Sequence, residues 1–263
     1  MQAMIYDPHP ISHSPFGTLM LGDCLQLLQQ LPPESVDMVL VDPPYGLTKN
    51  PWDVVIPFDL LWPQLMRVSR DHAAIIVFSS GMFTADLMQS NRRYWRYNLV
   101  WQKTSPAGFL NARRQPLRCH EDICVFYRHQ PVYHPQKHEG VRKVSSAGHH
   151  KRCKMSTNYG SYTPIDYDST QRYPLSVLVF PKDTRKSAFH ATQKPVALLR
   201  YLIRTYTDPG SIILDCCCGS GSTGVAALQE GRRYVLMERD EHIFDKALSR
   251  LYETMESMTI TNP

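Results

Sequence analysis

Residues 36–45, Val-Asp-Met-Val-Leu-Val-Asp-Pro-Pro-Tyr, join an apolar run to a compact polar and aromatic group. The run Val36–Val41 predicts a short buried strand. The two prolines that follow stiffen the backbone and favour extended conformations. The tetrad Asp42-Pro43-Pro44-Tyr45 is therefore expected at the carboxyl edge of a sheet, where open α/β sheets bind ligands.

The chemistry of this tetrad suits a planar ring that carries an amino substituent. The carboxylate of Asp42 and the carbonyl of Pro43 can accept the two N–H bonds of the amino group, and Tyr45 can stack on the ring. A Pro-Pro turn after a strand with an incidental tyrosine is the alternative interpretation, because short motifs occur by chance.

A second motif lies far downstream. Ser211–Leu214 predicts a strand, and the segment Asp215-Cys-Cys-Cys-Gly-Ser-Gly-Ser-Thr-Gly224 joins it to a helix. Such a turn brings backbone N–H groups up to a ligand, but neither the dinucleotide spacing nor a P-loop is present. The next strand, Tyr234–Met237, ends in Glu238, at the position where a ribose diol is held. The pattern favours a ribose-bearing cofactor without a phosphate cradle, which S-adenosylmethionine satisfies; a generic βαβ unit with a solvated Glu238 is the alternative.

Taken together, the tetrad at residues 42–45 and the glycine-rich segment Asp215–Thr223 resemble the amino-methyltransferases of DNA, which methylate adenine N6 or cytosine N4. His190-Ala-Thr-Gln-Lys-Pro195 resembles the segment that precedes the cofactor motif in these enzymes. The catalytic motif comes first here, with a long insert before the cofactor motif, which is similar to the permuted β group. The turn Gly22-Asp23-Cys24 also fits that group.

The resemblance implies an α/β fold of the Rossmann-like, S-adenosylmethionine-dependent methyltransferase type. We expect a mixed, mostly parallel sheet with helices on both faces and a circularly permuted motif order. The implied activity is site-specific methyl transfer from S-adenosyl-L-methionine to adenine N6 in double-stranded DNA. Adenine is favoured because the tetrad begins with Asp42, where cytosine enzymes more often have serine. Cytosine N4 methylation and a catalytically weak DNA-binding module remain alternatives.

The resemblance also assigns residues. Catalysis falls to the tetrad Asp42, Pro43, Pro44 and Tyr45. The expected cofactor-binding residues are Asp23, Cys24, His190, Thr192, Gln193, Lys194, Pro195, Asp215, Cys217, Gly219, Ser220, Gly221, Ser222, Thr223 and Glu238. Cys216 and Cys217 stand where the family usually has Pro-Phe or another aromatic after the aspartate, so the aromatic side chain that would touch the cofactor is missing. We interpret the cysteines as small packing residues beside the cofactor.

The matched regions, roughly residues 17–128 and 189–252, leave the middle of the chain unmatched. We therefore predict a catalytic domain over residues 1–128 and 189–263 and a target-recognition insert over 129–188. Residues 128–189 hold 11 Lys and Arg against 4 Asp and Glu, whereas the whole chain has a net charge of +5. A basic insert indicates a polyanionic partner. The predicted DNA contacts are Arg142, Lys143, Lys151, Arg152 and Lys154.

Composition agrees with an intracellular enzyme. A hydrophobic content of 43% in 263 residues can build a core, and the sequence shows no membrane-spanning run and no signal peptide. Seven cysteines, three of them consecutive, do not suit a disulfide framework, which favours a reducing cytoplasm. The implied setting is the nucleoid of a prokaryote or phage-infected cell. A cognate restriction endonuclease and a homodimer are possible partners.

Periodicity predicts the remaining elements. Strands are expected at 19–21 and 73–78, with an antiparallel pair, 97–101 and 122–127, at the sheet edge; helices are expected at 24–31, 58–69, 84–91, 195–206 and 244–256. His134, His138, His149, His150 and Cys153 lack zinc-finger spacing, so no metal is expected. His120 and Glu121 resemble an acid–base pair. We favour a structural role for them, since methyl transfer from a sulfonium needs little proton transfer.

Overall fold

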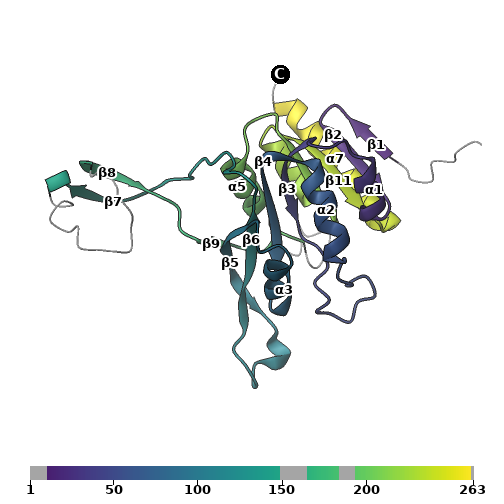
Figure 1. Ribbon diagram of the computed structural model, residues 1–263, viewed down its shortest axis with the longest axis horizontal. Coiled ribbons are helices and arrows are strands. Elements are labelled where there is room, and N and C mark those ends of the chain that lie inside the picture. Colours follow the sequence, from purple (N-terminus) through teal and green to yellow (C-terminus); the bar gives the residue numbers. More distant parts are fainter. Residues whose placement is uncertain (1–10, 149–164, 184–192, 262–263) are drawn as a thin grey trace, which may run out of the picture. The chain divides into compact units, whose positions relative to one another are not determined.

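The computed structural model describes residues 11–148, 165–183 and 193–261 (Figure 1). The chain divides into two compact units, a larger one of Met1–His134 with Ser176–Pro263 and a smaller one of Pro135–Leu175. The smaller unit is narrower than the predicted insert of 129–188. The difference arises because Val177–Phe180 (β9) pairs in parallel with a strand of the larger unit.

The larger unit is built on a mixed sheet. Its described residues form nine strands in the order β1-β2-β11-β10-β3-β4-β6-β5-β9. The strands β2, β11, β10, β3 and β4 are parallel to one another, and β6 runs antiparallel to both β4 and β5. Their bounds are β1 Ile11–Ser14, β2 Gly17–Leu21, β3 Val36–Val41, β4 Ser69–Ser79, β5 Trp95–Ala107, β6 Arg118–Phe126, β10 Ile212–Asp215 and β11 Arg233–Glu238. The predicted α/β class with a mostly parallel mixed sheet is confirmed.

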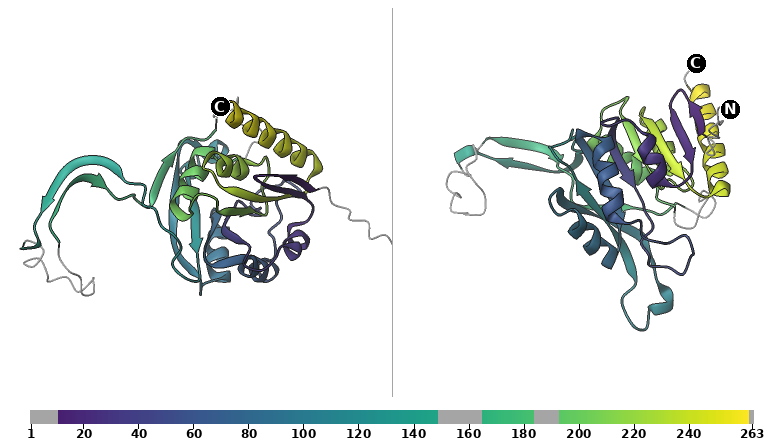
Figure 2. Two further views of the ribbon diagram at one scale, coloured as in Figure 1. Left: turned by 90° about the horizontal axis from the view of Figure 1, so that it is seen from above. Right: turned by 45° about the vertical axis from the view of Figure 1, so that its right-hand side comes forward.

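Helices cover both faces of this sheet (Figure 2). Met38 and Leu40 of β3 join a core with α5, α6 and α7, whereas Val39 and Val41 join a second core with α1, α2 and α3. Alternate residues of a strand point to opposite faces, so one apolar strand serves both layers. The helix bounds are α1 Cys24–Gln30, α2 Phe58–Val68, α3 Met82–Ser90, α5 Val196–Tyr206, α6 Ser222–Gln229 and α7 Glu241–Thr261, with a 3-10 turn, η1, at Phe109–Asn111.

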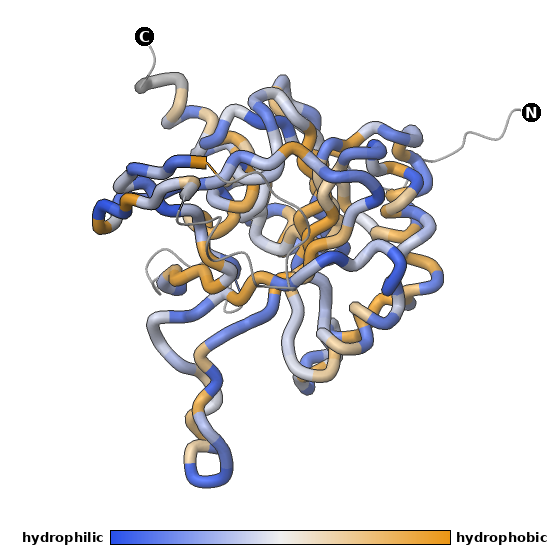
Figure 3. Tube along the Cα trace, turned by 60° about the vertical axis from the view of Figure 1, so that its left-hand side comes forward, coloured by the Kyte–Doolittle hydropathy of each residue, from blue (hydrophilic) through white to orange (hydrophobic). Residues whose placement is uncertain are grey.

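Many hydrophobic residues, coloured orange in Figure 3, lie toward the middle of the larger unit. Leu40 of β3 and Ile76 of β4 are fully buried. Among the described helices, none combines the length and apolar character that crossing a bilayer requires.

The antiparallel pair β5–β6 differs from its prediction in two respects. It is not at the sheet edge, because β9 pairs with the outer side of β5. It is also longer than predicted, so His120 and Glu121 lie within β6 rather than before it. The first residues of β6 are mostly polar, so a prediction based on apolar periodicity began the strand too late.

The smaller unit contains a two-stranded antiparallel ribbon. Its strands are β7 His138–Ser145 and β8 Tyr167–Arg172. The side chain of Arg142 on β7 donates to both carboxylate oxygens of Asp168 on β8, at 2.7 and 2.6 Å. Weak periodicity in this stretch gave no strand prediction, and the ribbon is the observed local structure.

Candidate functional site

A cavity of about 950 Å³ opens at the carboxyl ends of β3, β10 and β11 in the larger unit. Its position matches the sheet edge predicted for the tetrad and the glycine-rich turn. Every described residue that was predicted for catalysis or cofactor binding lines it, except Pro195 and Gly221. Pro195 caps α5 and Gly221 caps α6, while His190 and Thr192 lie outside the described residues.

The tetrad forms one wall of this cavity. Asp42 follows β3 directly, and the hydroxyl of Tyr45 donates to Asp42 Oδ1 at 2.5 Å. The ring of Tyr45 stacks on that of Phe83 in α3, with centroids 5.0 Å apart and planes 28° apart. The prolines between them leave no backbone N–H to compete for the carboxylate. Asp42 and the aromatic ring are thus fixed side by side.

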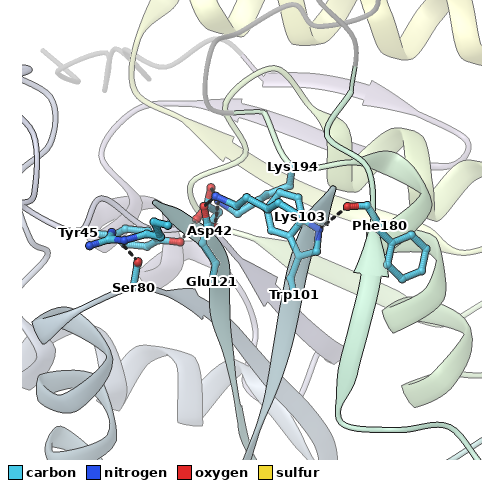
Figure 4. A network of polar contacts seen from close by, with 9 residues as sticks. Asp42, Tyr45, Ser80, Trp101, Lys103, Glu121, Phe180 and Lys194 are labelled. Atoms are coloured by element: carbon cyan, nitrogen blue, oxygen red, sulfur yellow. Dashed lines mark hydrogen bonds and ion pairs between the residues drawn. The ribbon is translucent and has the colours of Figure 1, made fainter. Parts of the chain in front are cut away.

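A chain of alternating charges continues from Asp42 into the cavity wall (Figure 4). Lys194 Nζ donates to Asp42 Oδ2 and lies 3.2 Å from Glu121 Oε2. The other oxygen of Glu121 pairs with Lys103, whose ammonium lies 4.9 Å from the ring centroid of Trp101. The side chains of Lys103, Lys194 and Glu121 are only 7%, 8% and 14% exposed. Charged groups this far buried remain ionised only when they are paired with opposite charges, and here two cations alternate with two carboxylates.

Burial and pairing act in opposite directions on these groups. Burial raises the pKa of Asp42 above its ordinary value, although the Lys194 cation opposes the change. The pKa of Glu121 is lowered despite its burial, because Lys194 and Lys103 together outweigh it. Burial alone would lower the pKa of Lys194, but Asp42 and Glu121 raise it. Lys194 therefore stays charged, and its cation opposes the protonation of Asp42 that burial favours.

The loop after the tetrad is held by a buried carboxylate, Asp53. It accepts from the backbone N–H groups of Gly46, Leu47 and Thr48 at 2.8, 3.0 and 2.7 Å. Hydrogen bonds from the side chain of Thr48 and from the backbone of Gly46 and Thr48 lower the pKa of Asp53, although its burial opposes them. The loop consequently closes back on the tetrad and presents further cavity-lining residues.

The opposite wall is the glycine-rich turn after β10. Asp215 is buried, and its carboxylate accepts from the hydroxyl of Thr223 at 2.6 Å and from the N–H of Cys217 at 3.0 Å. Burial raises the pKa of Asp215 to about 7. Gly221 has φ +76°, and a Cβ there would lie 3.2 Å from the Cβ of Ala247. The turn thus needs glycine both for its backbone conformation and for close packing against α7.

Two further carboxylates border this turn. Glu238 accepts from the N–H of Gly219, Arg239 and Asp240, each at 2.9 Å. Burial raises its pKa, although these backbone bonds oppose the rise. Asp23 caps α1 by accepting from the N–H of Leu25 at 2.9 Å. Both residues line the cavity and also stabilise local backbone.

The cysteines cluster on the same wall. Cys24, Cys216, Cys217 and Cys218 all line the cavity, and none of the described cysteines is in a disulfide. Hydrogen bonds from Cys216 and Cys217 lower the pKa of the Cys24 thiol. Small thiols thus occupy the space beside the turn. No described group of three or more His, Cys, Asp or Glu side chains is arranged to hold a metal ion.

Sequence reasoning missed much of the charged chain. Lys103 was not singled out, and Glu121 was given a structural role outside the site. Trp101 and Glu121 face each other across the β5–β6 pair, and Lys103 lies two residues further along the same face of β5. The spacing of two residues between Trp101 and Lys103 was visible in the sequence and places both on one face of a strand. Only the register between β5 and β6, however, shows that this face lies beside Glu121. Lys194, predicted to bind the cofactor, lines the cavity, and its ammonium contacts Asp42 and Glu121.

The predicted DNA-binding residues fall in the smaller unit. Arg142 and Lys143 are exposed on β7, and Arg142 forms the pair with Asp168 described above. Lys151, Arg152 and Lys154 lie outside the described residues.

The chain is similar in sequence to two proteins that are named as methyltransferases. The chain is 25% identical over 90% of its length to the type II methyltransferase M.HinfI of Haemophilus influenzae, of which it covers 68%. It is 27% identical over 89% of its length to the DNA adenine methyltransferase YhdJ of Escherichia coli, of which it covers 82%. Both relatives are named as methyltransferases, but only the second name states a base.

The fold also matches a solved structure. The cytosine-N4-specific PvuII DNA methyltransferase superposes with a TM-score of 0.67, over 92% of this chain and 91% of the other. Their identity is 14%, so the likeness concerns the fold alone. The family model N6_N4_Mtase, described as DNA methylase, matches residues 36–249, which include the tetrad and the glycine-rich turn. This chain belongs to the N6_N4_Mtase family of DNA methylases.

Proposed function

We propose that this DNA methylase transfers a methyl group from S-adenosylmethionine to N6 of adenine in double-stranded DNA. The observation that carries the proposal is the single cavity that joins Asp42 and Tyr45 on one wall to Asp215 and Glu238 on the other. The first wall suits an amino group on an aromatic ring, and the second suits a nucleoside. Methyl transfer between two such ligands requires this adjacency.

The donor set of the second wall fits S-adenosylmethionine. It presents the carboxylates of Asp23, Asp215 and Glu238 and the backbone of the 215–223 turn. Carboxylates accept hydroxyl and ammonium donors but repel phosphates. Glu238, already held by three backbone bonds, is placed to accept from a ribose diol, and Asp23 lies at the turn that would face the adenine. The cofactor, when bound, supplies an activated sulfonium methyl group.

Asp42 prepares the acceptor amine. An exocyclic amino group is a poor nucleophile because its lone pair is delocalised into the ring. Acceptance of both N–H bonds by Asp42 and the Pro43 carbonyl would draw them out of the ring plane and localise the lone pair. A carboxylate has about four lone-pair sites, so Asp42 can accept an N–H while it keeps Lys194. The amine nitrogen would gain the methyl group and afterwards lose one N–H proton, to Asp42 or to solvent. Most of the rate would come from positioning and from fixed charge.

The target base must leave the duplex to reach Asp42. Tyr45 would stack on the extruded ring, and Phe83 behind it fixes the tyrosine plane. The smaller unit, as a target-recognition insert, would supply phosphate contacts and base readout. The catalytic domain in this proposal comprises the regions flanking that insert.

The chain order supports assignment to the permuted β group with an Asp-Pro-Pro-Tyr motif. The strand β3 precedes the tetrad and comes long before β10 in the sequence, yet the two strands are neighbours in the sheet. A cognate restriction endonuclease and a nucleoid location in a prokaryote or phage-infected cell belong to the same proposal. M.HinfI, a type II methyltransferase by name, supports the restriction link.

The substitution Asp42→Ala tests the catalytic assignment. We expect methyl transfer to unmethylated DNA to be abolished while S-adenosylmethionine binding stays within a few-fold of wild type, because Asp42 touches the amine rather than the donor. Asp59→Ala, an exposed carboxylate on α2, is the matched control and should behave as wild type. Activity of Asp42→Ala within a few-fold of wild type would contradict the assigned role.

The modified base is identified separately. Digestion of methylated DNA to nucleosides and mass analysis should give N6-methyl-2′-deoxyadenosine, as Asp at the first tetrad position favours. Detection of N4-methyl-2′-deoxycytidine instead would show that the acceptor base is cytosine. DNA binding without methyl transfer would show a catalytically weak binding module instead.

A further inference from the structure

The tip of the β5–β6 hairpin is an exposed apolar turn that the catalytic mechanism does not use. Between Ala107 and Arg118 the chain leaves the sheet, and η1 forms its tip (Figure 1). Phe109 and Leu110 in η1 are 77% and 84% exposed, the largest exposures of adjacent apolar side chains among the described residues. Two large apolar residues held in water side by side indicate a contact surface.

The tip is structured rather than extended. Gly108 enters it with φ +83°, and its carbonyl accepts from the N–H of Asn111 at 2.9 Å. The N–H of Ala112 donates to the carbonyl of Phe109 at 3.1 Å. These bonds fix the turn, so the two apolar side chains are presented together on a defined backbone.

The base of the same hairpin borders the cavity. Lys103 and Ala107 of β5 line it, and Arg118 at the start of β6 donates to the hydroxyl of Ser80 at 2.9 Å. Ser80 (Figure 4) lies three residues before Phe83, on which the ring of the tetrad residue Tyr45 stacks. The apolar tip is therefore only a few residues beyond the cavity rim in both strands.

The charge of the hairpin selects its partner. Residues 104–120 contain Arg113, Arg114 and Arg118 and no Asp or Glu. A purely apolar protein surface that covers Phe109 and Leu110 would gain little from this positive charge, whereas a polyanion with an apolar interior is complementary to both features. Stacked base pairs between phosphate backbones have that chemistry.

We infer that Phe109 and Leu110 insert into the base stack of duplex DNA and fill the gap left when the target base enters the cavity. The inference rests on the proposed function. Apolar side chains that enter base steps are a known way to stabilise opened or kinked duplexes. Arg113 and Arg114, which directly follow the tip, hold the flanking phosphates. This contact is separate from the target-recognition insert and reads no sequence.

The test compares two DNA substrates that differ only in whether the target base is paired. The sequence that the wild-type protein modifies is first mapped and built into one fully paired duplex. A second duplex places the same target base opposite an abasic nucleotide. The double variant Phe109→Ala/Leu110→Ala should lose at least about tenfold in methyl-transfer rate on the paired duplex, because opening is no longer compensated, but stay within about threefold on the unpaired one.

Leu60→Ala, an exposed apolar residue on α2 outside the cavity, is the control and should change neither rate. Retained activity on the unpaired duplex shows that the double variant is folded. Equal losses of rate on both duplexes, or no loss on either, would contradict insertion of Phe109 and Leu110 into the base stack. So would a change in sedimentation from dimer to monomer with equal losses, which would assign the tip to a second copy of the chain.

Failure of the proposed function has a different signature. The wild-type protein would then methylate neither duplex. In that case, the affinities of wild type and double variant are measured for a random duplex with and without a central abasic site. If the double variant loses affinity mainly for the intact duplex, the tip inserts into the base stack. If wild type and double variant bind both duplexes equally well, the insertion is contradicted.

Discussion

At the scale of single residues, the site depends on one buried cation. Lys194 lies between Asp42 and Glu121, and burial of any of the three without its partners would be costly. Burial raises the pKa of Asp42, and the Lys194 cation is the neighbour that most strongly opposes this rise. Only the ionised form of Asp42 accepts from the amine N–H and from Lys194 without carrying a proton of its own. The acid limb of the activity profile should therefore report Asp42.

Lys194→Met should move that limb. Activity falls as pH drops through the pKa of Asp42, and removal of the cation that lowers this pKa shifts the fall to higher pH. Lys194→Arg keeps the charge and should restore the wild-type limb. The measurement is the methyl-transfer rate from pH 5 to 9 for the three proteins. A lower plateau with an unmoved limb in Lys194→Met would mean that Lys194 acts by some route other than the ionisation of Asp42.

Glu238 provides a second prediction at this scale. It should accept from the ribose diol, and a hydrogen bond to a charged group contributes about 1.5–3 kcal/mol. Glu238→Ala should weaken S-adenosylmethionine binding by roughly 10- to 150-fold in calorimetry. Asp23→Ala should also weaken it. Unchanged affinity in both variants would reject this pocket, and Asp59→Ala again serves as the control.

At the scale of elements, the turn between β10 and α6 makes the stability of the fold depend on pH, because it buries the carboxyl group of Asp215. The pKa of Asp215 is about 7, raised from 3.8 by burial, so the folded protein favours its protonated form. The stabilisation is fully present below pH 4 and is lost as pH rises through 7. One pKa unit corresponds to about 1.4 kcal/mol, which makes the effect a few kcal/mol at most.

Asp215→Asn should remove that dependence. The wild-type free energy of unfolding in urea should fall from pH 5 to pH 8, and the fall should be smaller in Asp215→Asn. Asp59→Asn, which changes an exposed carboxylate, should follow the wild-type curve. Equal falls in wild type and Asp215→Asn would show that Asp215 is not the titrating group.

The elements also show which structure the sequence could predict. The run Val36–Val41 and the turn after β10 carry strong local signals, so their strands and their place at one cavity were predictable. The parallel pairing of β9 with β5 was not, because Val177–Phe180 lies in a stretch without clear periodicity and its partner is some eighty residues away. The Lys103–Glu121 pair was missed for a similar reason. Local patterns do not encode the register between two strands.

At the scale of the whole molecule, charge is divided between the two parts of the chain. The surplus of Lys and Arg over residues 128–189 exceeds the net charge of the complete protein, so the remainder is slightly negative. Phosphate contacts should therefore concentrate in the insert, while the cavity keeps a balanced set of charges. Each phosphate contact contributes about 0.9 to the slope of log affinity against log salt.

Neutralisation of Lys151, Arg152 and Lys154 to Gln tests this division. Affinity for DNA should fall on all sequences, and the salt slope should flatten by about 0.9 for each phosphate that is no longer neutralised. Cofactor affinity should barely move, because these residues lie outside the cofactor motifs. Parallel slopes with equal affinities would mean that the cluster is only a solvated face. A selective decrease on one sequence would instead assign these residues to base readout.

Two neighbours on β7 provide an internal comparison for the same titration. Arg142 is paired with Asp168, whereas Lys143 has no ion-pair partner among the described residues. A cation already neutralised by a carboxylate must give up that partner to bind a phosphate, so its net gain is smaller. Lys143→Gln should therefore flatten the salt slope by about 0.9 and Arg142→Gln by less. If Arg142→Gln has the larger effect, the Arg142–Asp168 pair opens on DNA, and Asp168→Asn should then raise affinity by releasing the guanidinium.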